Sequence, residues 1–209
     1  MIFLMSFFLL LLASIGDVYE VIRNNGYRYF WFLMGFVVML LLNAVNRRNR
    51  EIFMKTHHEL THMVLGFITF KEIHRMKVEK QRGSVVVSGN NVLIETVTLA
   101  PYCLPLLAYV VMIFGFFFAR DMSYAFYIFL GMAYMFHLLC IKFDFKSFKD
   151  MGRSQEDINQ FPLLFSYSYI LCFWLFNTMI ILVTIRNNNI FKSFVFMFDS
   201  FKETIMNIF

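Results

Sequence analysis

Long apolar runs separated by short polar segments fill most of the chain. Five runs predict transmembrane helices, because each approaches the roughly 20 apolar residues that cross a bilayer. They are residues 1–15, 29–45, 92–119, 122–141 and 161–185. The first run would alternatively be a cleaved signal peptide, but it lacks a basic start and a convincing small-residue cleavage site. We therefore interpret it as a span.

The C-terminal segment, residues 190–209, has a different pattern. Its sequence, IFKSFVFMFDSFKETIMNIF, interleaves Phe, Met and Ile with Lys192, Asp199, Lys202 and Glu203. This mixture is typical of a helix that lies in the membrane interface. We expect this segment not to cross the membrane.

The amino-acid composition also indicates a membrane protein. The 209 residues are 59% hydrophobic, with 29 Phe and a mean hydropathy of +0.62, which is far from soluble-domain averages. The length leaves no room for a further soluble domain of ordinary size. Although the net charge is +5, the basic residues lie in short loops and no nucleic-acid motif is present, so we expect no nucleic-acid partner. Cys103, Cys140 and Cys172 lie in apolar runs without CxxC spacing, which predicts packing roles.

Charge in the polar segments predicts the orientation. Residues 46–56 and 71–82 are rich in Lys and Arg, whereas the loop 16–28 balances basic and acidic residues. The positive-inside bias therefore places 46–56, 71–82 and the N-terminus in the cytoplasm. Residues 57–70 then enter the membrane between two cytoplasmic flanks without crossing it. The third and fourth spans return residues 142–160 to the same side, where they can meet residues 57–70.

Candidate chemistry lies in THHELTH, residues 56–62, which contains the HExxH pattern of His58, Glu59 and His62. On a helix, positions i and i+4 share one face, so both imidazoles can bind one Zn²⁺ with Glu59 beside the water. The pattern is uncommon by chance in a chain with five His, and ionisable residues in a membrane segment are usually functional. Alternatively, Thr56 and Glu59 form a capping box at the start of a helix whose histidines are solvated. We favour a metal site with Glu59 as the catalytic base.

The sequence around this motif resembles a known family. HELTHMVLGFITFKEIHRMKVEKQRGSVVVSG resembles the zinc-site helix and the membrane-associated β-hairpin of the site-2 protease family of intramembrane zinc metalloproteases, in a compact form. LAPYCLP is similar to the start of that family's next helix, so the resemblance covers residues 56–108 well. It implies cleavage of transmembrane segments of other membrane proteins within the lipid bilayer.

The hairpin suggests how a substrate is held. Residues 83–89 alternate small and β-branched residues between two glycines, as expected for an edge strand. An unwound substrate could add to this edge through backbone hydrogen bonds. The predicted substrate-binding residues are Ser84, Val85, Val86, Val87 and Ser88. A plain structural hairpin explains the strand equally well.

A catalytic zinc usually has a third protein ligand. In the family this is an aspartate after two further spans, often in an Asp-Gly pair, which this chain lacks. The run SQEDI before FPLLFS resembles the aspartate motif of compact relatives and implies Asp157 as the ligand. Asp144, among phenylalanines near the membrane surface, is the second choice, although an ion pair with Lys142 or Lys146 would also explain it. Asp150 is expected to be solvated.

The other histidines and the helix-breaking prolines are expected to have more limited roles. His137, near the cytoplasmic end of the fourth span, is a candidate to orient a ligand or contact substrate, or it bonds to a neighbouring helix. His57 and His74 lack the spacing to join the motif pair. Pro101 and Pro105 remove helix donors and should bend the third span beside the zinc helix.

We therefore predict an all-α integral membrane protein. It has about five transmembrane helices, a short re-entrant zinc helix, a membrane-associated β-hairpin and an interfacial C-terminal helix. Residues 1–209 form one polytopic domain. Its parts are an N-terminal pair of spans (1–55), a zinc-protease-like core (56–185) and the C-terminal helix (186–209).

The predicted function is hydrolysis of peptide bonds in or near transmembrane segments of membrane proteins. Zn²⁺ held by His58, His62 and Asp157 activates water and the scissile carbonyl, and Glu59 takes the proton. The alternative is a catalytically inactive protease-like membrane protein that binds transmembrane partners.

Overall fold

A computed structural model describes residues 2–45, 50–78, 83–88, 93–118, 124–151, 156–187 and 189–208. The elements in chain order are α1 (Ile2–Ala13), α2 (Ile15–Arg23), α3 (Gly26–Val45), α4 (Arg50–Ile68), β1 (Glu72–Val78), β2 (Gly83–Ser88), α5 (Ile94–Cys103), α6 (Leu106–Phe118), α7 (Tyr124–Met151), α8 (Glu156–Asn159), α9 (Leu163–Asn187) and α10 (Ile190–Ile208). Ten elements in these ranges are helices and two are strands, so the protein is mainly helical.

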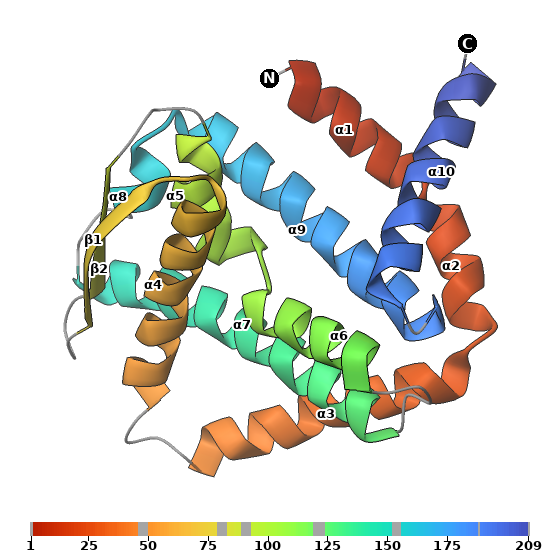
Figure 1. Ribbon diagram of the computed structural model, residues 1–209, viewed down its shortest axis with the longest axis horizontal. Coiled ribbons are helices and arrows are strands. Elements are labelled where there is room, and N and C mark those ends of the chain that lie inside the picture. Colours follow the sequence, from red (N-terminus) through yellow and green to blue (C-terminus); the bar gives the residue numbers. More distant parts are fainter. Residues whose placement is uncertain are drawn as a thin grey trace.

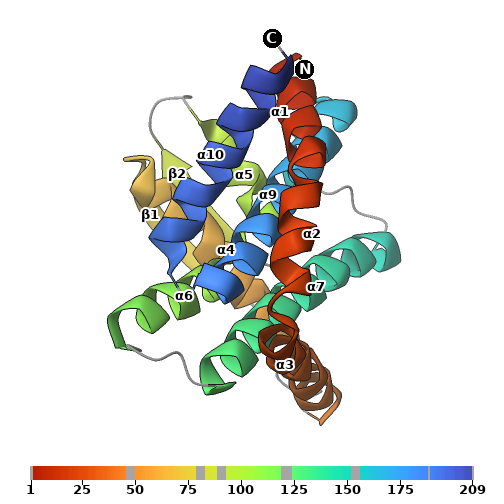
Figure 2. The same cartoon turned by 90° about the vertical axis from the view of Figure 1, so that its right-hand side faces the viewer.

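Helix α9 runs diagonally between two groups of elements (Figure 1). On one side α1, α2 and α10 pack against it. On the other side α5 and α8 contact it, and α4 and the two strands lie beyond them. Helices α3, α6 and α7 lie together across one end of the molecule, as the view turned by 90° also shows (Figure 2). All the residues predicted to bind zinc lie in the part that contains α4 and α8.

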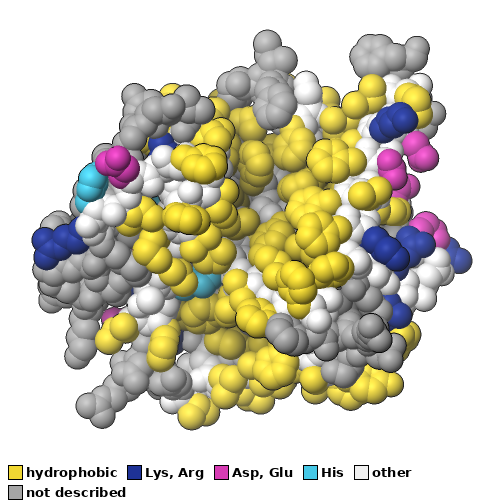
Figure 3. All heavy atoms as spheres, in the orientation of Figure 1, with side chains coloured by type: hydrophobic (Ala, Val, Ile, Leu, Met, Phe, Trp, Pro, Cys, Tyr) yellow, Lys and Arg dark blue, Asp and Glu magenta, His cyan; other side chains and the backbone are white. Residues whose placement is uncertain are grey.

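Several helices have the length and composition of membrane spans. Helices α3 and α9 and the Tyr124–Phe145 part of α7 each meet both requirements. Helices α5 and α6 would make a fourth span although they are bent by 83°. Hydrophobic side chains also cover much of the face in Figure 3, and most described charged side chains lie near its edges. These features support an integral membrane protein.

The predicted count of five spans is too high for the described residues. The first predicted span forms α1, which has only 12 residues. At 1.5 Å per residue it is about 18 Å long, whereas the hydrocarbon core is about 30 Å thick. The loop predicted for residues 16–28 is also wrong in part, because residues 15–23 form α2. That helix is amphipathic, with Val18 buried against the core and Asp17 in its first turn.

The third predicted span is bent, as expected, but at one proline only. Pro105 lies between α5 and α6, where Leu104 adopts an extended conformation. Pro101 instead lies inside α5, which continues to Cys103. A proline has no N–H, so the carbonyl of Val97, four residues earlier, loses its helical donor. This carbonyl becomes available to another element.

The position of α7 is set by close packing against α3. A Cβ atom on Gly131 would collide with the carbonyl oxygen of Phe32, and one on Gly35 would collide with the carbonyl oxygen of Ile128. Only glycine allows the two backbones to approach this closely. The contact fixes α7, whose C-terminal half reaches α4.

Strands β1 and β2 pair antiparallel beside α4 (Figure 1). Glu72 pairs with Ser88 and Val78 with Gly83, with an irregularity between Ile73 and Arg75. The predicted edge strand therefore exists as backbone. The side chains of residues 84–88, predicted to bind substrate, lie outside the described part.

Candidate metal centre

The HExxH motif lies in the middle of α4 and not at its start. The helix begins at Arg50, and the hydroxyl of Thr56 donates a hydrogen bond to the carbonyl oxygen of Ile52 at 2.8 Å. The capping box considered for Thr56 and Glu59 is therefore wrong, because the backbone N–H groups there already have helical partners. Capping of a helix start therefore does not explain why the motif is present and buried.

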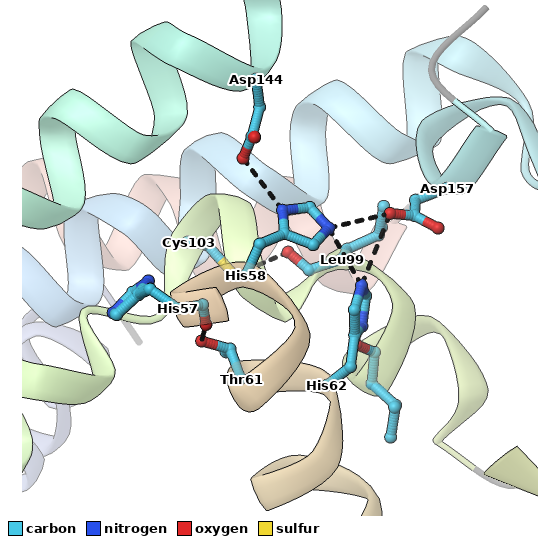
Figure 4. Close-up of polar contacts among 9 residues, drawn as sticks. His57, His58, Thr61, His62, Leu99, Cys103, Asp144 and Asp157 are labelled. Carbon is cyan, nitrogen blue, oxygen red and sulfur yellow. Dashed lines mark hydrogen bonds and ion pairs between the residues drawn. The ribbon is translucent and has the colours of Figure 1, made fainter. Parts of the chain in front are cut away.

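Three donor atoms from α4 and α8 converge on one point (Figure 4). The Nε2 atoms of His58 and His62 are 3.1 Å apart. Oδ2 of Asp157 lies 3.3 Å from Nε2 of His58 and 3.5 Å from Nε2 of His62. Ligand atoms of a tetrahedral zinc ion, with bonds of about 2.0–2.1 Å, lie about 3.4 Å apart. The three atoms are therefore spaced as three corners around one zinc ion.

The other ring nitrogen of each motif histidine has its own acceptor. Nδ1 of His58 donates to Oδ2 of Asp144 at 2.9 Å, and Nδ1 of His62 donates to the carbonyl oxygen of Val97 at 2.8 Å. When Nδ1 carries the only proton of each ring, as it would beside a bound metal, each Nε2 presents a lone pair to the shared point. Both bonds orient the rings as the outer partners of metal-bound histidines do.

This arrangement separates the two candidate aspartates. Asp157 lies on the Nε2 side of His58, where a metal would bind, whereas Asp144 lies on the Nδ1 side. The ion pair with Lys142 considered for Asp144 is not what the described residues show, because Asp144 is buried and bonds to His58. The side chain of Lys146 lies outside the described part. The side chain of Asp150 lies outside the described residues.

The partners of the motif are held by contacts to α9. Asp157 belongs to the short helix α8, whose Ile158 is fully buried, and Ser166 of α9 donates to the Ile158 carbonyl at 2.8 Å. Tyr169 of α9 donates to the hydroxyl of Thr96, next to Val97, at 2.9 Å. Helix α9 thereby places both the candidate ligand and the outer carbonyl.

Electrostatics at the centre favour a positive charge. Burial lowers the pKa of His58, but its hydrogen bonds to the carboxylates of Asp144 and Asp157 outweigh burial and raise the pKa to about 10. Burial raises the pKa of Asp157, but the bonds with His58 and His62 outweigh burial and hold it well below the ordinary value. Burial raises the pKa of Glu59, although the two histidines partly oppose this. Protons and metal ions therefore compete for the same donor atoms.

The remaining histidines lie elsewhere. His57 points away from the three donor atoms (Figure 4). Its pKa is lowered to about 4, mainly by burial and to a smaller extent by the adjacent His58. His74 lies on β1 and is exposed, 3.9 Å from a carboxylate oxygen of Glu72. His137 is fully buried and has no hydrogen-bond partner in the part of the chain that the structure describes. It therefore does not orient a zinc ligand through a hydrogen bond.

Two contacts of the centre were not predicted from sequence. One is the Val97 carbonyl, for which Pro101 four residues later was the available signal. The other is Tyr102, a fully buried ring that packs edge-on against His58 with ring centres 5.5 Å apart. Tyr102 lies in the LAPYCLP run, where the sequence carries no signal that separates a single tyrosine from a core residue.

No family model, curated protein or solved structure matches this chain. The likeness to site-2 proteases therefore stays a prediction from the motif, and the geometry of the centre carries the functional argument.

Proposed function

We propose that this protein is an intramembrane zinc metalloprotease that hydrolyses peptide bonds in or near transmembrane segments of membrane proteins. The observation that carries the proposal is the triangle of 3.1, 3.3 and 3.5 Å between the Nε2 atoms of His58 and His62 and Oδ2 of Asp157. Two histidines and one carboxylate are a common ligand set of catalytic zinc, which keeps a fourth position open.

The donor set fits zinc in chemistry as well as spacing. Nitrogen and oxygen donors suit zinc, and both histidines have the outer hydrogen bonds that zinc ligands usually have. A zinc ion held by His58, His62 and Asp157 would supply a Lewis acid that acidifies water and polarises a peptide carbonyl.

The chain itself supplies the proton transfer. Glu59 follows His58 directly, is buried, and has a raised pKa. A carboxylate with a raised pKa is better matched to taking a proton from water near neutral pH and returning it to the leaving amine. Asp144 and the Val97 carbonyl hold the two imidazoles in the orientation that the reaction needs.

The surroundings suit a substrate inside a membrane. The centre lies among helices that include candidate spans, and β1 and β2 lie beside α4. A transmembrane segment must unwind before cleavage, and an extended chain can pair with the β2 backbone at residues 84–88. The basic flanks of α4 support a cytoplasmic orientation of the N-terminus and of the loops around the zinc site.

A substitution of the base tests this proposal. We expect purified Glu59→Gln to keep zinc and to lose cleavage of tagged single-span model substrates in proteoliposomes, by at least about a hundredfold. Glu51→Gln is the matched control, because Glu51 is an exposed glutamate in the first turn of the same helix.

Two results would contradict the proposal. Wild-type protein that holds no zinc after purification in zinc-containing buffer would remove the metal centre. Zinc-loaded wild-type protein that captures transmembrane segments only as well as the Glu59→Gln variant does, and never cleaves them, would favour the inactive binding protein.

A further inference from the structure

A second pair of histidines lies where α4 meets α7. The ring centres of His57 and His137 are 6.1 Å apart. His57 is 8% exposed and His137 is 0% exposed. All four ring nitrogens are buried and have no hydrogen-bond partner among the described residues. This pair takes no part in the metal centre described above.

Unpaired buried nitrogens call for a ligand, because removing them from water without a partner is unfavourable. The neighbouring side chains that the structure describes do not provide one. The ring of Phe136 meets His57 edge-on at 5.3 Å between centres. Met54, one turn before His57, and Cys140, one turn after His137, belong to one buried apolar cluster. The two imidazoles thus have apolar and sulfur-containing residues as neighbours in the described part of the chain.

We propose that His57 and His137 bind one monovalent copper ion, Cu(I), between α4 and α7. A neutral imidazole offers one nitrogen lone pair, so two imidazoles supply two donors without adding charge. A single positive charge is easier to bury among apolar side chains than the double charge of zinc. Nearby thioether and thiol sulfur also favours a soft metal.

The separation of the rings agrees with this ion. With metal–nitrogen bonds of about 2 Å, imidazoles on one metal have ring centres about 5 Å apart at a tetrahedral angle and about 6 Å apart when the bonds are collinear. His58 and His62 show the first spacing, 4.9 Å, and His57 and His137 show the second, 6.1 Å. Cu(I) accepts two nearly collinear nitrogen ligands, whereas zinc prefers a tetrahedron.

Competition for Cu(I) tests the site. Full-length protein in detergent is first saturated with zinc, and Cu(I) is then added anaerobically with bicinchoninate as the competing chelator. We expect wild-type protein to withdraw about one Cu(I) per chain. His57→Leu and His137→Leu should each bind it at least about tenfold more weakly. His74→Leu, at an exposed histidine, should bind as wild type does.

Leucine is close to histidine in volume and leaves no unpaired nitrogen, so both variants are expected to fold. Thermal unfolding measures this, and added Cu(I) should raise the midpoint of wild-type protein but not of the variants. His58→Ala, which removes a zinc ligand, should still bind Cu(I). Failure of wild-type protein to compete with the chelator would overturn the inference. Cu(I) binding as tight as wild type in a variant that carries both His57→Leu and His137→Leu, or loss of Cu(I) binding in His58→Ala, would overturn it too.

Discussion

Helix α4 carries histidines at adjacent positions in opposite environments. At His58 each ring nitrogen has polar neighbours, with Asp144 on Nδ1 and with His62 and Asp157 on Nε2. At His57 neither ring nitrogen has a hydrogen-bond partner in the described structure. Both residues are buried to nearly the same extent, 9% and 8% exposed.

The difference shows that the neighbours, and not the residue type or its burial, set the chemistry of a histidine. Carboxylates facing His58 raise its pKa to about 10, although burial alone would lower it. Burial without such partners lowers the pKa of His57 to about 4. One face of α4 therefore offers carboxylate and imidazole donors that suit a cation, and the other offers neutral imidazole nitrogen.

The largest effect that separates the two faces is loss of zinc. We expect His58→Ala or His62→Ala to reduce bound zinc from about one per chain to near zero, because two ligands hold the ion poorly. His57→Ala should keep its zinc. Metal analysis of the purified proteins measures this, and equal loss in all three variants would show that the wrong face of α4 has been assigned.

The next effect separates the two aspartates around His58. Asp157→Ala removes a ligand, so zinc affinity should fall by more than about a hundredfold and cleavage should cease. Asp144→Ala removes only an outer hydrogen bond, which should weaken zinc by about ten- to a hundredfold and leave partial activity. Competition with a zinc chelator measures both. The reverse order would make Asp144 the ligand.

The pH dependence of zinc binding follows from His58. Its pKa of about 10, above the ordinary 6.5, means that the metal-free protein holds a proton there at neutral pH. Zinc must displace this proton, so affinity should rise by about tenfold per pH unit from pH 6 towards 9. The same proton stabilises the metal-free fold fully below about pH 6.5, and this contribution is lost as the pH rises through about 10. A flat affinity over this range would mean that His58 is neutral without metal.

Much of the helical plan and the motif pair could be predicted from periodicity and spacing. The four later apolar runs each contain helices of the structure, and the three cysteines are free and buried. The predictions fail where the length of a segment or its surroundings decide whether it forms a span, a helix or a loop. Residues 1–15 are apolar enough for a span but too short, and residues 15–23 are polar enough for a loop but amphipathic enough for a helix.

The roles of the aspartates show what sequence could not settle. Asp144 and Asp157 lie 86 and 99 residues from His58, and both reach its ring. Which one faces Nε2 depends on how α7 and α8 pack around α4, which is a property of tertiary structure. A family resemblance ranked Asp157 first, and the Nε2 geometry gives that ranking a physical reason.

The smallest effect concerns Pro101 and tests the outer bond of His62. Because Pro101 has no N–H, the Val97 carbonyl is free to accept from Nδ1 of His62 at 2.8 Å. Pro101→Ala restores a competing helical donor. We expect zinc affinity to fall by up to about tenfold, while α5 becomes more stable because an interior proline is removed.

A fall in zinc affinity together with a rise in stability would distinguish this role of Pro101 from simple packing. Val97→Ala is the control, because it trims a buried side chain but keeps the carbonyl, so it should lower stability and leave zinc affinity unchanged. Chelator competition and thermal unfolding measure the two quantities on each variant. If Pro101→Ala binds zinc as tightly as wild type, the carbonyl can serve both donors through its two lone pairs, and the proline acts on the helix alone.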